Sequence, residues 1–201
     1  MYNKNFWDER YNTGEYLYGT EANAFLVKHA DLLQGPVLSL SEGEGRNAVF
    51  LATRGLSVLG VDCSEVGLAK AQSLAQSRGV VIETEVADLA EFQPKENHFG
   101  AIVSISAHLP SAIRHQLYPQ LEKALQPDGI FLLEAYAESQ LAKDTGGPKD
   151  LDMLMTVAKL RQELPSLKPI LALEIEREVS EGKGHTGMAS VVQYIARKAV
   201  E

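Results

Sequence analysis

Two glycines and a downstream acid have the residue types and the spacing that nucleoside binding requires. Gly43 and Gly45 follow a short apolar run at 37–40 and precede a helix that the pattern predicts at 46–54. Asp62 ends the next apolar run, 19 residues beyond Gly43. Glycines let a ligand approach the backbone, a helix start offers unpaired N–H groups, and an acid at this distance suits ribose hydroxyls. The spacing therefore predicts a βαβ unit that binds a nucleoside cofactor.

The acids in the turn indicate which nucleoside the site suits. The run 43–48 also satisfies the G-x-G-x-x-G/A pattern of dinucleotide enzymes, which is a weak signal by itself. Glu42 and Glu44 flank Gly43, where a dinucleotide would place its pyrophosphate, and like charges in contact cost on the order of several kcal/mol. Arg46 offsets only part of that charge. The pattern therefore favours S-adenosylmethionine, which carries sulfonium and ammonium cations, over NAD.

Composition limits the class of protein. The chain has 201 residues, 45% hydrophobic and 23% charged, as expected for one domain with a full core. No apolar run reaches the roughly 18 residues of a membrane span, and Cys63 is the single cysteine, so no internal disulfide is possible. A net charge of −8 argues against a broad nucleic-acid or anionic-membrane surface. We expect a single cytoplasmic domain over 1–201 with a small-molecule substrate, and neither nucleic acid nor membrane as partner. The sequence does not indicate an oligomeric state.

Apolar periodicity predicts strands that alternate with helices. The expected strands lie at 37–40, 56–62, 80–86, 101–105 and 130–133, and the expected helices at 22–33, 46–54, 64–77 and 110–125. Such alternation indicates an α/β protein with a parallel sheet. Two more strands, at 171–179 and 188–196, have no helix between them and should pair antiparallel. The last strand is apolar on both faces, so we expect it inside the sheet.

Two further segments flank the predicted sheet. Residues 1–35 are expected to form an N-terminal helical cap. Residues 139–166 hold a Gly-Gly-Pro run at 146–148 and an expected helix at 150–163, with methionines at 153 and 155. A long excursion beside a site is often a lid or a substrate wall. The alternative is an inert surface insertion.

Several motifs together resemble those of the class I S-adenosylmethionine-dependent methyltransferases. Within that family the chain looks closest to the small bacterial tellurite-resistance and thiopurine methyltransferase-like group. The segments that carry the likeness are 6–11, 42–47, 60–64, 86–89, 127–129, 181–182 and His185. The resemblance spans essentially the whole chain. It implies a Rossmann-like, doubly wound, seven-stranded and mostly parallel sheet, whose antiparallel last strand inserts between the fifth and the sixth.

The resemblance also implies the residues that contact the cofactor. Asp62 would accept hydrogen bonds from both ribose hydroxyls, and Asp88 would meet the adenine amino group. The implied set is Trp7 and Tyr11 folded over the cofactor, Gly43 and Gly45 beneath the methionine part, Cys63 and Leu89 beside the adenine with Ser64 in the same motif as Cys63, and Ser104, Ile105 and Ser106 at the methionine part and open to the substrate. Arg46 is a separate candidate for a contact with the cofactor carboxylate, and the alternative is that it pairs with Glu44 or Glu42.

The first strand departs from the family pattern. The family usually carries Asp or Glu there, just before the turn, whereas this chain has Ser39 and Ser41. Because a serine brings no charge to the cofactor's ammonium group, our hypothesis is that Glu42 provides it. The alternatives are a non-catalytic protein that binds S-adenosylmethionine and an NAD-dependent oxidoreductase with a Rossmann site.

Three residues are candidates for the acceptor side. Methyl transfer mainly requires alignment and shielding, and soft sulfur, selenium or tellurium nucleophiles need at most a weak base. His108 follows the fourth predicted strand and is the first candidate, and His185 lies between the last two strands. The alternatives are a capping or solvent-facing His108 and a loop-stabilising His185. Arg114 is a candidate anion contact. No two histidines have the spacing of metal ligands, so we expect no metal.

Overall fold

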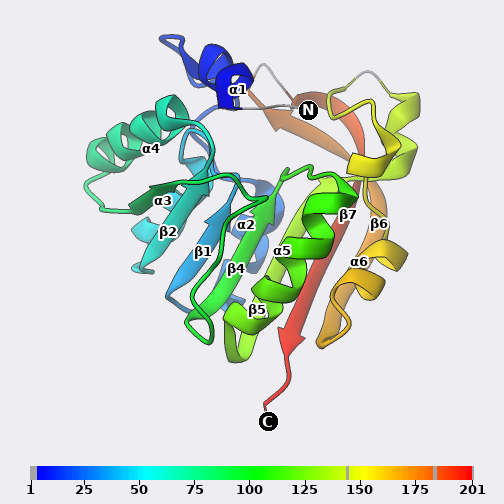
Figure 1. The fold of residues 1–201 in the computed structure, drawn as a ribbon. Helices are drawn as coiled ribbons and strands as arrows, with labels where there is room; N and C mark the ends of the chain where they lie inside the picture. The colour runs from blue at the N-terminus through cyan, green and yellow to red at the C-terminus, as the bar shows by residue number, and fades with distance from the viewer. Residues whose placement is uncertain (1–3, 144, 183–184, 201) are drawn as a thin grey trace.

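A seven-stranded sheet organises the chain in the order β3-β2-β1-β4-β5-β7-β6 (Figure 1). The computed structural model describes residues 4–143, 145–182 and 185–200. The strands are β1 (Val37–Leu40), β2 (Val58–Asp62), β3 (Glu83–Val86), β4 (Phe99–Ile105), β5 (Leu125–Tyr136), β6 (Leu167–Glu181) and β7 (His185–Lys198). Strands β1 to β5 pair parallel, and β7 lies antiparallel between β5 and β6. The predicted mostly parallel sheet with an inserted antiparallel last strand is confirmed.

Helices cover both faces of the sheet, so the predicted doubly wound arrangement is also confirmed. The helices are α1 (Lys4–Tyr11), α2 (Ala24–His29), α3 (Arg46–Thr53), α4 (Glu65–Ser77), α5 (Ser111–Ala124) and α6 (Val157–Glu163), with short 3₁₀ turns at Ala30–Leu32, Glu138–Ala142 and Leu151–Met153. On one face α5 and α6 contribute Leu117 and Leu160 to a buried cluster with Phe131 of β5. On the other face α2 and α3 contribute Leu26 and Leu51 to a second cluster.

Some helix predictions are wrong in their bounds. The helix expected at 150–163 begins only at Val157, because the Thr156 side chain accepts a hydrogen bond from the Lys159 N–H and caps α6 there. The preceding residue, Met155, donates its backbone N–H to the Tyr136 carbonyl at 2.9 Å, which draws the chain into a bridge beside β5. Similarly, the helix expected at 22–33 begins after Asn23 and ends in a 3₁₀ turn.

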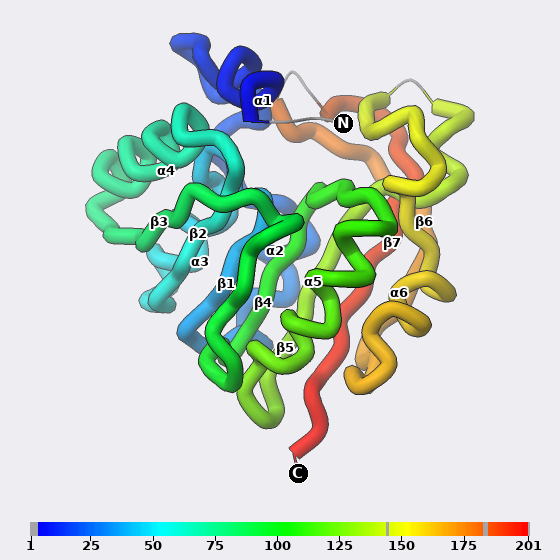
Figure 2. The backbone as a smooth tube through the Cα atoms, in the orientation of Figure 1, coloured from blue at the N-terminus to red at the C-terminus, as the bar shows by residue number. Residues whose placement is uncertain are grey.

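The N-terminal helix and the segment between β5 and α6, both predicted to lie outside the sheet, are found at one edge of it, at the carboxyl ends of the parallel strands (Figure 1). Helix α1 lies across this edge (Figure 1). Figure 2 follows the backbone from β5 through the 3₁₀ turns at 138–153, which lie at the same edge, and back to α6. The β6–β7 hairpin ends there too, although residues 183 and 184 of its loop lie outside the described residues. Across the described ranges, no helix combines the length and the apolar character that crossing a bilayer requires.

Candidate active site

A cavity of about 570 Å³ opens at the carboxyl edge of the sheet. Its walls come from α1, the β1–α3 turn, the ends of β2 and β4, residues 146–153 and the start of β7. Ligands of open α/β sheets bind at this edge. The sequence-predicted residues that line the cavity are Trp7, Tyr11, Glu42, Gly43, Arg46, Asp62, Cys63, Asp88, Leu89, Ile105, Ser106, His108 and His185.

Three predicted contacts lie behind the cavity wall and support it. Gly45 precedes α3 with a φ of 94°, and a Cβ there would lie 2.6 Å from the Ala71 Cα of α4. The Ser64 side chain caps α4 by accepting the Gly67 N–H at 3.0 Å. Ser104 is buried within β4. These three residues therefore do not line the cavity, and they support its wall from behind.

Arg114, predicted as an anion contact, does not line the cavity, and its guanidinium makes four hydrogen bonds within the protein. Only 2% of the residue is exposed. Its Nε and Nη2 donate to the Glu163 carboxylate of α6 at 2.8 and 3.0 Å. Its Nη1 donates to the carbonyls of Leu109 and Asp152 at 2.5 and 2.7 Å. Arg114 thus ties α5 to α6 and to the 3₁₀ turn at Leu151–Met153, and no anion contact is available at this guanidinium.

Asp62 joins the end of β2 to the glycine turn. Its Oδ2 accepts the Gly43 N–H at 2.9 Å and its Oδ1 accepts the Ser64 N–H at 2.8 Å. Burial raises the pKa of Asp62, and these backbone hydrogen bonds oppose the rise. Gly43 adopts a left-handed φ of 59°, and a Cβ there would lie 2.7 Å from the Tyr11 hydroxyl. Only glycine fits this position, because the backbone must pass directly beneath the α1 aromatic ring.

The two glutamates that flank Gly43 have different partners in the structure. The Glu42 carboxylate is buried, where it accepts the Ser39 hydroxyl and, at 2.9 Å, the Ala48 N–H of α3. Burial raises the pKa of Glu42 to about 7. Glu44 instead pairs with Lys70 and accepts the Leu17 N–H at 2.8 Å. Lys70 therefore neutralises the charge of Glu44. Glu42 is the acid of the turn whose pKa lies near neutral pH.

Helix α1 covers the cavity with aromatic side chains. The Trp7 ring stacks on the buried Tyr11 ring, with centroids 5.5 Å apart and planes inclined by 21°. Asp8 anchors the helix by accepting the Ser64 hydroxyl at 2.6 Å. Lys70 holds the helix end by donating to the Tyr11 carbonyl at 3.2 Å and to two later carbonyls. Helix α1 is thus held against the turn that contains Gly43.

Arg46 is the basic residue of the turn, and one edge of its guanidinium is occupied. Its Nη2 donates to the Glu181 carboxylate at 2.6 Å. Its Nη1 is buried and has no hydrogen-bond partner among the described residues. Buried donors nearly always have a partner. Because Arg46 lines the cavity at the first turn of α3, this N–H group suits an anionic ligand group such as a carboxylate.

The two candidate histidines have different surroundings. His108 stacks on Tyr136, and its Nε2 accepts the Tyr136 N–H at 3.0 Å. Burial, with a smaller effect of nearby His185, lowers the pKa of His108 to about 3. A neutral ring whose lone pair is already used is a poor general base, so the geometry favours His108 as part of the wall. His185 packs on Tyr18, and its Nδ1 lies 3.8 Å from the Glu181 Oε2.

Residues 145–153 form a wall of the cavity that is attached to β5 and β7. Gly147 packs against the Tyr136 ring, where a Cβ would lie 2.6 Å from a ring carbon. The Tyr136 hydroxyl donates to the Thr145 carbonyl at 3.3 Å, and the Thr145 hydroxyl donates to the Met188 carbonyl at 2.9 Å. Met153 lines the cavity, whereas the neighbouring Leu154 and Met155 are core residues.

Sequence reasoning missed several groups that shape this site. Tyr18 and Gly19 line the cavity from the segment between α1 and α2, where the sequence shows no periodicity. The pairing of Glu181 with Arg46 joins residues 135 positions apart, so local spacing carried no signal for it. Within the described part of the chain, no cluster of three or more His, Cys, Asp or Glu side chains could hold a metal ion.

Residues 37–129 match a sequence family described as a methyltransferase domain. The matched stretch is a little under half of the chain. It runs from β1 into β5, so it contains the glycine turn, Asp62 and Asp88. The 145–153 wall and the β6–β7 hairpin follow it in the chain. The match does not favour the alternative of an NAD-dependent oxidoreductase.

Individual proteins are also similar to this chain. The curated 2-heptyl-1-hydroxyquinolin-4(1H)-one methyltransferase of Mycobacteroides abscessus is 26% identical over 119 residues, which are 58% of this chain. The aligned part spans 52%, about half, of that relative's length. A protein solved for "Conversion of a Disulfide Bond into a Thioacetal Group during Echinomycin Biosynthesis" superposes with a TM-score of 0.77 at 20% identity, over 98% of this chain and 91% of the other. TehB from Haemophilus influenzae superposes with a TM-score of 0.69 at 18% identity, over 97% and 66%. These likenesses show a common fold.

Proposed function

We propose that this protein is an S-adenosylmethionine-dependent methyltransferase that acts on a small molecule. The observation that carries the proposal is one cavity lined by an acid that ends β2 and an acid that follows β3, together with a buried Arg46 N–H group that has no hydrogen-bond partner among the described residues. Asp62 and Asp88 stand where a nucleoside requires acceptors, and Arg46 stands where the amino-acid part of the cofactor requires a donor. The methyltransferase-domain match covers all three residues.

The described residues fit the cofactor group by group. Asp62 would bind the ribose hydroxyls, Asp88 and the Leu89 backbone would bind adenine, and the Trp7–Tyr11 pair would exclude water from above. Arg46 Nη1 would take the carboxylate, and Glu42 would face the ammonium group in place of the charge that Ser39 lacks. S-adenosylmethionine supplies a methyl group that its sulfonium has already activated. The chain aligns the acceptor against the wall at 145–153 and shields it.

The acceptor we propose is a soft nucleophile such as a thiol or a selenol. His108 offers no base, so the acceptor's proton must leave without help from that ring. Thiols lose their proton near neutral pH more readily than alcohols or amines do. His185, beside Glu181, is the remaining candidate for an acceptor-side contact. The superposition with TehB is consistent with a place in the tellurite-resistance and thiopurine methyltransferase-like group.

Calorimetry with S-adenosylhomocysteine and with NADH tests the proposal directly. We expect saturable binding of S-adenosylhomocysteine and none of NADH, followed by methyl transfer from S-adenosylmethionine to at least one thiol or selenium compound in a panel. Binding without turnover on thiol, selenium, tellurium and nitrogen acceptors would instead indicate a non-catalytic cofactor-binding protein. Tight binding of NADH would contradict the proposal.

Glu42 makes cofactor binding depend on pH. Its pKa of about 7 in the ligand-free protein means that it is largely protonated at pH 6, whereas pairing with an ammonium group requires the charged form. Binding therefore releases a proton below pH 7, and affinity rises with pH. We expect S-adenosylhomocysteine to bind up to about tenfold more tightly at pH 8 than at pH 6, since one coupled proton changes affinity tenfold per pH unit.

The matched variant is Glu42→Gln, which keeps the side-chain size and removes the titration. Its affinity should stay flat between pH 6 and pH 8 and should fall below that of the unaltered protein at pH 8. A variant that binds S-adenosylhomocysteine as tightly as the unaltered protein at pH 8 would show that Glu42 does not serve the ammonium group.

A further inference from the structure

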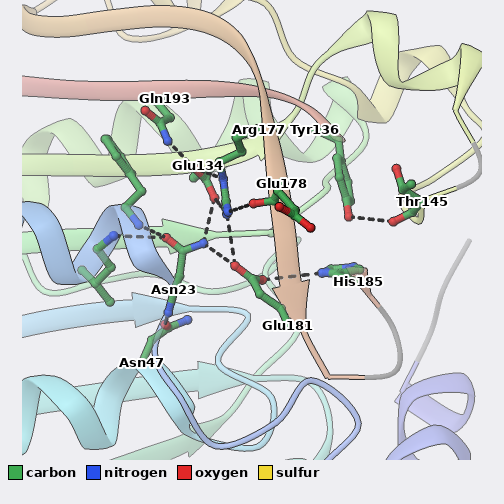
Figure 3. Close-up of polar contacts among 12 residues, drawn as sticks. Asn23, Asn47, Glu134, Tyr136, Thr145, Arg177, Glu178, Glu181, His185 and Gln193 are labelled. Carbon is green, nitrogen blue, oxygen red and sulfur yellow. Dashed lines mark hydrogen bonds and ion pairs between the residues drawn. The ribbon is translucent and has the colours of Figure 1, made fainter. Parts of the chain in front are cut away.

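A buried network of charged and amide side chains joins β5, β6, β7 and the cap of α2 (Figure 3). Arg177 of β6 donates to the Glu134 carboxylate of β5 through Nε, at 3.1 Å, and through Nη2. Gln193 of β7 donates to the same carboxylate at 2.6 Å. Asn23, the cap of α2, donates through one amide nitrogen to Glu134 at 2.7 Å and to Glu181 at 2.8 Å. Four elements are thus fastened together beneath the cavity.

Glu181, the last residue of β6, is where this network reaches the cavity. Its Oε1 accepts from Asn23 and, at 3.1 Å, from Arg177 Nη2. Its Oε2 accepts from Arg46 Nη2 at 2.6 Å. Burial by itself would raise the pKa of Glu181, but hydrogen bonding to His185 and the charges of Arg46 and Arg177 outweigh it and hold the pKa well below its usual value. Glu181 is therefore a permanent anion in this network.

The backbone around Glu181 is also fixed. Gly182 adopts a left-handed φ of 61°, and a Cβ there would lie 2.3 Å from the Leu17 carbonyl. The Leu17 N–H is in turn held by Glu44 of the cofactor turn. The end of β6 therefore packs closely against the segment that contains Tyr18 and Gly19. Both of these residues line the cavity.

We infer that Glu181 is a positioning residue for cofactor binding: by holding the Nη2 edge of Arg46, it directs the Nη1 edge at the cofactor's carboxylate. The inference rests on the proposed function. A guanidinium is a rigid fork, so fixing one edge fixes the other. Without Glu181 the Arg46 side chain would gain rotational freedom that ligand binding must remove. It could also turn towards Glu42, whose charge acts on it across the turn.

Comparing the affinities of two ligands distinguishes this positioning role from a general contribution of Glu181 to the stability of the fold. S-adenosylhomocysteine carries the amino-acid part, and 5′-methylthioadenosine has the same nucleoside and thioether but lacks the carboxylate. Calorimetry on Glu181→Gln should show about 10- to 100-fold weaker S-adenosylhomocysteine binding, as expected for a charge-assisted hydrogen bond. Binding of 5′-methylthioadenosine should change by less than about threefold. Glu181→Asp, which keeps the charge, should recover part of the loss.

The controls use the same strand and the same guanidinium. Glu178→Gln alters an exposed acid of β6 and should leave both affinities unchanged. In an Arg46→Met background, Glu181→Gln should cause no further loss of S-adenosylhomocysteine affinity, because the two residues act through one contact. If Glu181→Gln does not fold, Glu181→Asp, whose shorter carboxylate cannot reach Arg46 as closely, should show the same selective loss in smaller measure.

The outcomes distinguish the inference from the function it rests on. Equal losses for both ligands, or a full additional loss in the Arg46→Met background, would overturn the positioning role of Glu181. If the unaltered protein binds neither ligand, the proposed function fails instead.

Discussion

Asp62→Ala is expected to weaken S-adenosylhomocysteine binding by about 30- to 1000-fold, as the loss of two charge-assisted hydrogen bonds to a buried ribose implies. Asp62 is 6% exposed, and it already accepts the Gly43 and Ser64 N–H groups. The substitution therefore removes both the ribose acceptor and the support of the turn on which the cofactor rests. Calorimetry at fixed pH measures the change.

Two companion variants separate these contributions. Asp62→Asn keeps the side-chain shape and one carbonyl acceptor, so it should retain the turn and lose mainly the charge-assisted part of the affinity. Asp31→Ala removes an exposed acid whose partner is Arg54, the C-cap residue of α3 at the helix end away from the glycine turn, and should not change binding. A loss of less than threefold for Asp62→Ala would show that the nucleoside does not sit at this strand end.

The sheet and the nucleoside turn were predictable because their signals are local. A strand, two glycines, a helix start and an acid within 37–62 specify one βαβ unit, and the structure places Gly43 and Asp62 within a hydrogen bond of each other. The antiparallel insertion of β7 was predictable for a similar reason, since two strands without an intervening helix leave few arrangements. Both predictions rested on residues that lie close together in the sequence.

The corrected residues depend on partners that are distant in the chain. Arg114 looked available as an anion contact until α6 brought Glu163 to its guanidinium. His108 looked like a base until β5 brought the Tyr136 N–H to its Nε2. In both cases the residue type and its place after β4 were informative, but a hydrogen bond from another element decided whether the group was available. Such pairings follow from tertiary packing, which spacing does not encode.

The departure at Ser39 has a physical explanation in the same terms. The family that the chain resembles usually has an acid on this strand, whereas this chain has Ser39, and the Ser39 hydroxyl donates to the Glu42 carboxylate. Gly60 on the adjacent strand makes room for it, since a Cβ there would lie 3.1 Å from the Glu42 Cγ. The acid of this chain is therefore Glu42 in the turn rather than a residue of β1, and its carboxylate contacts the start of α3. This is why the cofactor affinity of this protein should follow the titration of Glu42.

Gly45→Ala is expected to lower the free energy of unfolding by about 4 kcal/mol, the sum of backbone strain and overpacking. A Cβ at Gly45 would lie 2.6 Å from both the Cα and the Cβ of Ala71, so α3 and α4 would have to separate. Gly55→Ala is the matched control, because Gly55 has a similar φ of 84° but no atom within 4 Å of the position that an added Cβ would take. That variant should cost only about 1 kcal/mol, from strain alone. Urea unfolding monitored by circular dichroism measures both values. Equal losses in the two variants would mean that the close approach of α3 to α4 at Gly45 does not contribute to stability.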